Sequence, residues 1–189
     1  MNNLIADYLD LTTICLHADA ADWVSVLELL GRRLHASGAV RPSFVDALIA
    51  REWARPTGIR LGAGVNVGLP RTDPEHVIRP GLALATLVKP VSFGSMDHPG
   101  ELLPVRLVLV TASTEQSAHL RTLQRVAGLF QGRTTVDNLL TAESVAFVAA
   151  SICNGSDARV PAVQTGQLAD DLWFLRSKSE GGKGSATLN

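Results

Sequence analysis

A short apolar run passes directly into a polar loop near the middle of the chain, in the stretch Val65-Asn66-Val67-Gly68-Leu69-Pro70-Arg71-Thr72-Asp73-Pro74-Glu75-His76-Val77. The alternating residues Val65 to Leu69 predict a strand, and Pro70 marks its end. In open α/β sheets the ends of strands line the functional crevice. The loop that begins at Arg71 is therefore the first place to look for a site.

An amphipathic segment well before this run predicts a helix that ends near Gly38. Asp19 or Asp22 can cap its start, because both can offer a carboxylate to free backbone N–H groups. Apolar residues then recur at intervals of three and four, at Trp23, Val26, Leu27, Leu30 and Leu34. This pattern indicates one face packed on a core.

A second helix is predicted directly after the first. Ser43 followed by Asp46 resembles a capping box, in which the two side chains would satisfy free N–H groups at the helix start. The helical pattern continues to about Trp53, and Pro56 stops it.

The second half of the chain alternates strand and helix patterns. Leu82 to Val88 and Val105 to Val110 are short branched apolar runs, which predict buried strands. Ser113 or Thr114 can cap a following helix that carries His119. Further helical segments are predicted at residues 135–140, 142–153 and, as a short docked piece, 170–175. Helices interleaved with strands indicate the α/β class.

Length and composition predict one globular domain. The chain has 189 residues, 46% hydrophobic and 19% charged, enough for a sizeable core without disulfides or metal. We expect the domain to span residues 1–176. Residues 177–189 are rich in Gly, Ser and Lys and predict a disordered tail.

Charge and cysteine usage restrict the compartment and the partners. A formal net charge of -1 provides no basic field for nucleic acid or anionic lipid. Cys15 and Cys153 show no metal or redox spacing, which is typical of buried free thiols in a reducing compartment. No Lys or Arg precedes Arg32, and no apolar run reaches membrane-spanning length. These features predict a cytoplasmic protein without membrane insertion.

No organic cofactor or metal is expected. The glycines at positions 62, 64 and 68 form GxGxxxG and lead into a strand, whereas a phosphate loop needs a helix N-terminus.

Several separated motifs, in one order from about Asp19 to Cys153, resemble the enzyme IIA family of bacterial sugar phosphotransferase systems, in its fructose/mannitol/galactitol superfamily. They are Phe44–Glu52, Pro56–Ile59, Val65–Pro70, Thr72–Val77, Lys89–Met96, Val105–Thr111 and His119–Leu123. The phrase Thr72-Asp73-Pro74-Glu75-His76-Val77 is most similar to galactitol-type members. The resemblance implies a single α/β domain with a mixed sheet sandwiched between helices.

The resemblance also implies a site and partners. In the family a phosphorylated histidine directly follows the strand's terminal proline, an arginine of the second helix steadies the phosphoryl oxygens, and a second histidine follows a later strand. Here Arg51 matches the steadying arginine and His119 the second histidine, but Arg71 stands at the acceptor position. Thr72, Asp73 and His76 are the secondary phosphate-site candidates. The partners implied are the phosphocarrier HPr and an enzyme IIB component.

Arginine cannot act as the phosphoryl acceptor, because its guanidinium stays protonated and has no lone pair for attack. Arg51, Arg71 and His119 would instead form an anion pocket. His76 could take over only if the active centre had moved. Two functions stay open: a phosphocarrier lineage between HPr and IIB with its acceptor substituted, or a non-phosphorylatable module that acts by binding partners. A third interpretation is an unrelated α/β domain.

Overall fold

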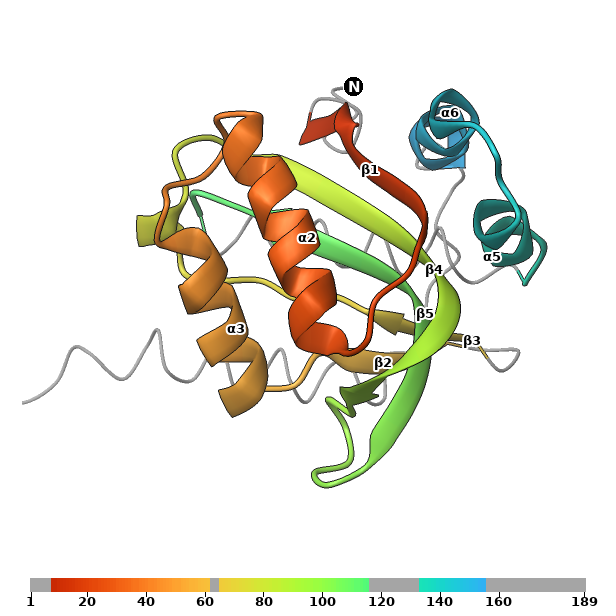
Figure 1. Ribbon diagram of the computed structural model, residues 1–189, viewed down its shortest axis with the longest axis horizontal. Coiled ribbons are helices and arrows are strands. Elements are labelled where there is room, and N and C mark those ends of the chain that lie inside the picture. Colours follow the sequence, from red (N-terminus) through yellow and green to blue (C-terminus); the bar gives the residue numbers. More distant parts are fainter. Residues whose placement is uncertain (1–7, 62–64, 116–132, 156–189) are drawn as a thin grey trace, which may run out of the picture. The chain divides into compact units, whose positions relative to one another are not determined.

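The computed structural model describes residues 8–61, 65–115 and 133–155, all within one unit, Met1–Ala158. Its centre is a mixed five-stranded sheet in the order β1-β4-β5-β3-β2 (Figure 1). The strands are β1 (Leu9–Ala18), β2 (Gly58–Leu61), β3 (Val65–Gly68), β4 (Gly81–Gly94) and β5 (Leu102–Ala112). β1 runs parallel to β4 and β3 parallel to β5, whereas β4–β5 and β2–β3 are antiparallel.

Helices cover both faces of the sheet. Successive residues of a strand point to opposite faces, and neighbouring residues of β4 accordingly enter two separate cores. Ala83 and Ala85 pack with α2 (Trp23–Ala36) and α3 (Phe44–Ala54). Leu82 and Leu84 pack with α5 (Arg133–Leu140) and α6 (Val145–Gly155). Figure 1 shows the two pairs of helices on opposite sides, which confirms the prediction of a mixed sheet between helices.

The first predicted helix is confirmed as α2, with its cap at the second of the two candidates. The Asp22 carboxylate accepts a hydrogen bond from the Ser25 N–H at 2.8 Å. At the other end Gly38 has φ +74°, a left-handed conformation that favours glycine. The Ala39 N–H returns to the Leu34 carbonyl at 3.0 Å and ends the helix.

The second predicted helix is confirmed as α3, but the predicted capping box is wrong. Ser43 occupies the cap position and makes no side-chain cap hydrogen bond. Its hydroxyl lies 2.9 Å from Nδ1 of His76 instead. A partner distant in sequence has displaced the local one.

The two apolar runs predicted as strands lie within longer strands, the first at the start of β4 and the second in the middle of β5. β4 bends through a register irregularity between Thr86 and Val91 and continues to Gly94. β1 and β2 were not predicted at all. The helices predicted at 135–140 and 142–153 are confirmed as α5 and α6 within a few residues.

Several predictions fall outside the described residues: the helix that carries His119, the segment 170–175 and the tail 177–189. Cys15 is a buried free thiol, as expected. In the part of the chain that the structure describes, no helix is long and apolar enough to cross a membrane.

Candidate functional site

The site begins where β3 ends. Leu69 and Pro70 are buried, and Arg71 follows them as a half-buried residue. Arg71 forms a parallel bridge with Thr111, whose N–H donates to the Pro70 carbonyl at 3.1 Å. Because β3 and β5 are parallel neighbours, their carboxyl ends meet at one edge of the sheet. This pairing brings the predicted loop beside the end of β5.

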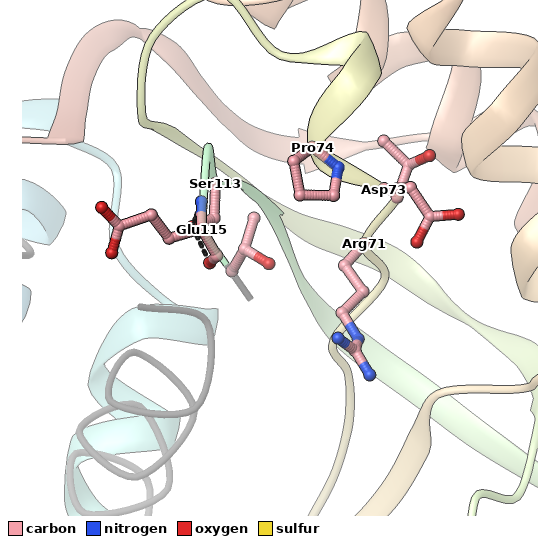
Figure 2. A pocket seen from close by; sticks show the side chains of 7 residues that line it. Arg71, Asp73, Pro74, Ser113 and Glu115 are labelled. Carbon is pink, nitrogen blue, oxygen red and sulfur yellow. Dashed lines mark hydrogen bonds between the residues drawn. The ribbon is translucent and has the colours of Figure 1, made fainter. Parts of the chain in front are cut away.

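A hollow opens between these two strand ends (Figure 2). It spans about 260 Å³ of space, which includes open solvent. The loop after β3 and the end of β5 line it, with Arg71, Thr72, Asp73, Pro74, Thr111, Ser113 and Glu115. The hollow thus contains three of the six predicted site residues.

Sequence reasoning missed the residues that β5 contributes to the hollow. Ser113 was considered only as a helix cap, and Thr111 and Glu115 were not singled out. The signal that could have found them is their place directly after the apolar run Val105 to Val110. This position indicates a role in the site only once β3 and β5 are known to be parallel neighbours.

Arg71 lies in an electrostatically unfavourable position for a cation. Burial is the main cause that lowers its pKa, and the nearby Arg51 and Arg55 lower it further, whereas Asp73 raises it. The resulting pKa of Arg71 is about 10, so the guanidinium stays charged at neutral pH. A charged group with two cationic neighbours attracts anions.

Arg51 reaches the same loop from α3, as expected. Its Nη1 lies 2.8 Å from Oδ1 of Asp73, in an ion pair. The Arg51 side chain is 19% exposed, and the Asp73 side chain is 56% exposed. The carboxylate therefore sits on the solvent side of a largely buried guanidinium.

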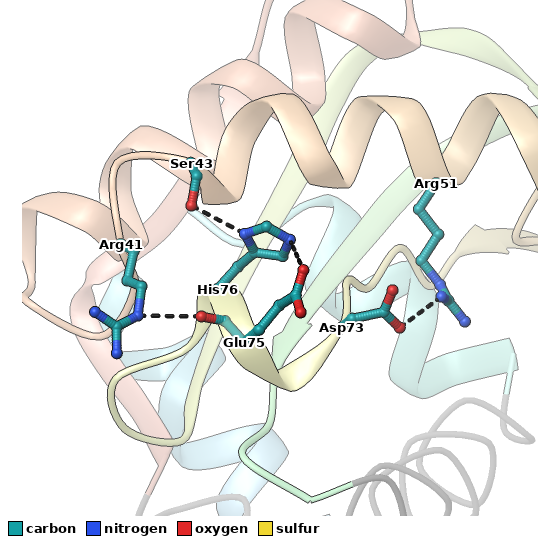
Figure 3. A network of polar contacts seen from close by, with 6 residues as sticks. All are labelled: Arg41, Ser43, Arg51, Asp73, Glu75 and His76. Atoms are coloured by element: carbon teal, nitrogen blue, oxygen red, sulfur yellow. Dashed lines mark hydrogen bonds and ion pairs between the residues drawn. The ribbon is translucent and has the colours of Figure 1, made fainter.

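His76 turns away from this ion pair (Figure 3). It closes the short 3-10 helix η2 (Pro74–His76), with Nδ1 2.9 Å from the Ser43 hydroxyl and Nε2 3.3 Å from the Glu75 carboxylate. The Arg41 N–H donates to the His76 carbonyl at 2.9 Å. His76 does not line the hollow. Its contacts fasten the loop to the start of α3.

In the described part of the chain, cationic side chains gather near the hollow, and no metal site is evident. This part contains no group of three or more His, Cys, Asp or Glu side chains placed to hold a metal ion. The cationic groups near the hollow are Arg51, Arg55 and Arg71. His119 lies outside the described residues, four positions after Glu115.

Comparison with known proteins identifies relatives over most of the chain. The model of the family "Phosphoenolpyruvate-dependent sugar phosphotransferase system, EIIA 2" matches residues 7–154. SgcA of Escherichia coli strain K12, described as a phosphotransferase IIA component, is 30% identical over 132 residues, which are 67% of this chain and 87% of SgcA. The galactitol-specific EIIA component of the same strain is 28% identical over 64% of this chain and 79% of its own length.

Solved structures share the fold. The IIA protein PtxA of Streptococcus mutans superposes with a TM-score of 0.67 at 25% identity, over 79% of this chain and 92% of PtxA. The mannitol IIA enzyme of Escherichia coli, solved in complex with phosphorylated mannitol IIB, has a TM-score of 0.63 at 22% identity, over 77% of this chain and 99% of that chain.

Proposed function

The chain belongs to the EIIA 2 family of the phosphoenolpyruvate-dependent sugar phosphotransferase system, and we propose that it acts in the cytoplasm as a IIA component that binds HPr and an enzyme IIB component. The mannitol IIA enzyme, which shares its fold, has been solved with phosphorylated IIB. That complex supports a docking role for this chain.

In this proposal, the phosphoryl group carried by a phosphorylated partner binds at Arg71 without forming a covalent bond to it. The observation that carries this proposal is the place of Arg71, immediately after Leu69 and Pro70 at the end of β3, where the resemblance puts the acceptor histidine. An acceptor needs a lone pair near neutral pH, as a neutral imidazole has. With its pKa at about 10, the Arg71 guanidinium presents donors only.

The neighbouring residues suit anion binding. Arg51 supplies a second guanidinium fork that matches phosphoryl oxygens. Thr72 lines the hollow together with Arg71 and adds a hydroxyl donor. The resemblance adds His119 to the proposed site, although this residue lies outside the described part of the chain. With such a site, the chain works as a non-phosphorylatable module that influences sugar uptake by binding its partner proteins.

Labelling by phosphorylated HPr tests this proposal. We compare wild type, Arg71→His and Arg55→His. The last variant is the matched control, because it makes the same change in charge near the hollow without placing an imidazole at the strand end. Intact-mass spectrometry at neutral pH then counts phosphoryl groups on each protein.

We expect an acid-labile phosphoryl group on Arg71→His, mapped to residue 71, and none on wild type or Arg55→His. Labelling of the folded wild type would contradict the proposal, whichever residue accepts. If the label on wild type disappeared in His76→Ala or His119→Ala, the relay would run through that histidine.

A further inference from the structure

The proposed anion site uses the guanidinium of Arg51, but in the structure this guanidinium is already paired with Asp73. Its 2.8 Å distance leaves the Arg51 Nη1 committed to the Asp73 carboxylate. Asp73 also lines the hollow together with Arg71. Arg51 is not among the residues that line the hollow, so a phosphoryl group bound beside Arg71 that also contacted Arg51 would compete with Asp73 for it.

The charges around the hollow favour that exchange. Arg51 and Arg55 each interact electrostatically with Arg71, and Asp73 is the carboxylate that opposes them there. Glu115 also lines the hollow, but in Figure 2 its carboxylate and the Arg71 guanidinium point in different directions. Among the charged groups that act on Arg71, two arginines thus stand against one carboxylate.

Asp73 can leave at little cost. Its side chain is 56% exposed, so water solvates the carboxylate once the ion pair opens. An ion pair that water reaches contributes little to stability. Arg51, by contrast, is largely buried and would be left without its partner unless another anion arrived. The exchange is therefore favourable only when an incoming anion takes over the contact.

We propose that Asp73 is a competing carboxylate that occupies Arg51 in the free protein, and that a phosphoryl group on a partner protein displaces it and bridges Arg51 and Arg71. The chain therefore binds the phosphorylated partner in preference to the unphosphorylated one. This inference rests on the proposed function, because it requires that the phosphoryl group stay on the partner.

The chemistry of the two partner states explains the preference. A phosphorylated histidine presents a doubly charged group with three acceptor oxygens, enough to bond two guanidinium forks at once. An unphosphorylated histidine presents an imidazole, which is neutral or cationic and cannot replace a carboxylate on Arg51. Only the phosphorylated partner overcomes the competition from Asp73.

The first experiment isolates the role of Asp73 with inorganic phosphate as the probe. Isothermal titration at neutral pH and fixed ionic strength compares wild type, Asp73→Asn and Glu101→Gln. Glu101 forms an exposed ion pair with Arg60, on the strand β2 and away from the hollow. Glu101→Gln therefore removes the same charge from an ion pair that does not border the hollow.

We expect Asp73→Asn to bind phosphate roughly tenfold more tightly than wild type, the effect of about 1.4 kcal/mol. Glu101→Gln should bind phosphate as wild type does. Equal gains in the two variants would show a general effect of net charge and overturn the proposal. Unchanged affinity in Asp73→Asn would overturn it as well.

The second experiment measures partner selectivity. Titration of wild type with phosphorylated and with unphosphorylated HPr should give at least about a tenfold difference in affinity, and Arg71→Met should remove most of it. Equal affinity for the two forms, with no transfer of the label, would overturn the inference while the proposed function stands. Transfer of the label to the chain would instead contradict the proposed function.

Discussion

The chemistry of the site depends on one side chain, Arg71. With a pKa of about 10, only roughly a thousandth of Arg71 is deprotonated at pH 7. Burial and the neighbouring cations weaken the charge without removing it. A bound anion relieves both unfavourable effects, because it pairs with the guanidinium and offsets its neighbours.

A buried ionisable side chain, Glu52, directly follows Arg51 in the sequence. Glu52 is 4% exposed, and its carboxylate accepts from the Thr57 N–H at 2.9 Å and from the Thr57 hydroxyl at 2.7 Å. Burial raises the pKa of Glu52, although the two hydrogen bonds with Thr57 oppose the shift. The folded protein thus holds this proton more tightly than the unfolded chain does.

The raised pKa of Glu52 predicts a pH dependence of stability. Between the unfolded and the folded pKa the native state binds more protons, so the free energy of unfolding falls as pH rises through this window. We expect Glu52→Gln, which keeps an acceptor for the Thr57 N–H and cannot ionise, to lose that decline. Urea unfolding of both proteins from pH 4 to 8 measures it; parallel curves would contradict the expectation.

At the scale of the elements, β2 and β4 approach closely where α3 leads into the sheet. A Cβ added at Gly58 would lie 2.6 Å from the backbone oxygen of Gly94, which cannot give way as a side chain could. The Met96 N–H also donates to the Gly58 carbonyl at 2.8 Å. The glycine is needed here for space, since its φ is not positive.

We expect Gly58→Ala to lower the free energy of unfolding by about 1–3 kcal/mol, the usual cost of overpacking. Arg60→Ala, an exposed position on the same strand, is the control and should cost under about 1 kcal/mol. Chemical denaturation of both variants measures the difference. Equal costs would show that the close approach at Gly58 can relax.

Sequence patterns predicted those elements whose signals are local. The first two helices follow from apolar spacing and punctuation, with Asp22 as a true cap. The capping box at Ser43 failed because its hydroxyl contacts His76, 33 positions away. The local pattern predicts no strand at β1 or at β2, which lies beside a glycine-rich stretch. These two edge strands form by hydrogen bonding to a neighbouring strand, and local sequence patterns do not predict that pairing.

At the scale of the whole molecule, the site exists because β3 and β5 pair in parallel. The sequence predicted that Arg71 follows a strand and that Arg51 belongs to the second helix. It could not supply Thr111, Ser113 and Glu115, because their proximity to Arg71 depends on the order of strands in the sheet. His76 was included for its place in the loop, and its ring proved to be engaged with Ser43 and Glu75.

The sheet order also explains why one loop can serve both the fold and the anion site. The loop after β3 is fixed at one end by the Thr111 N–H on Pro70 and at the other by the Arg41 N–H on His76. Between these anchors lie Arg71, Thr72 and Asp73. Asp73 can therefore exchange its partner while the backbone around it stays in place.

The state of the Arg71 side chain is most directly measured by NMR of its guanidinium at neutral pH, with and without phosphate. Arg71 is expected to show a protonated guanidinium throughout, and its Nε–H signal should shift with saturable phosphate binding, together with that of Arg51 and not that of Arg60. A neutral Arg71, or an Arg71 signal that phosphate leaves unchanged, would contradict an anion site built on this residue.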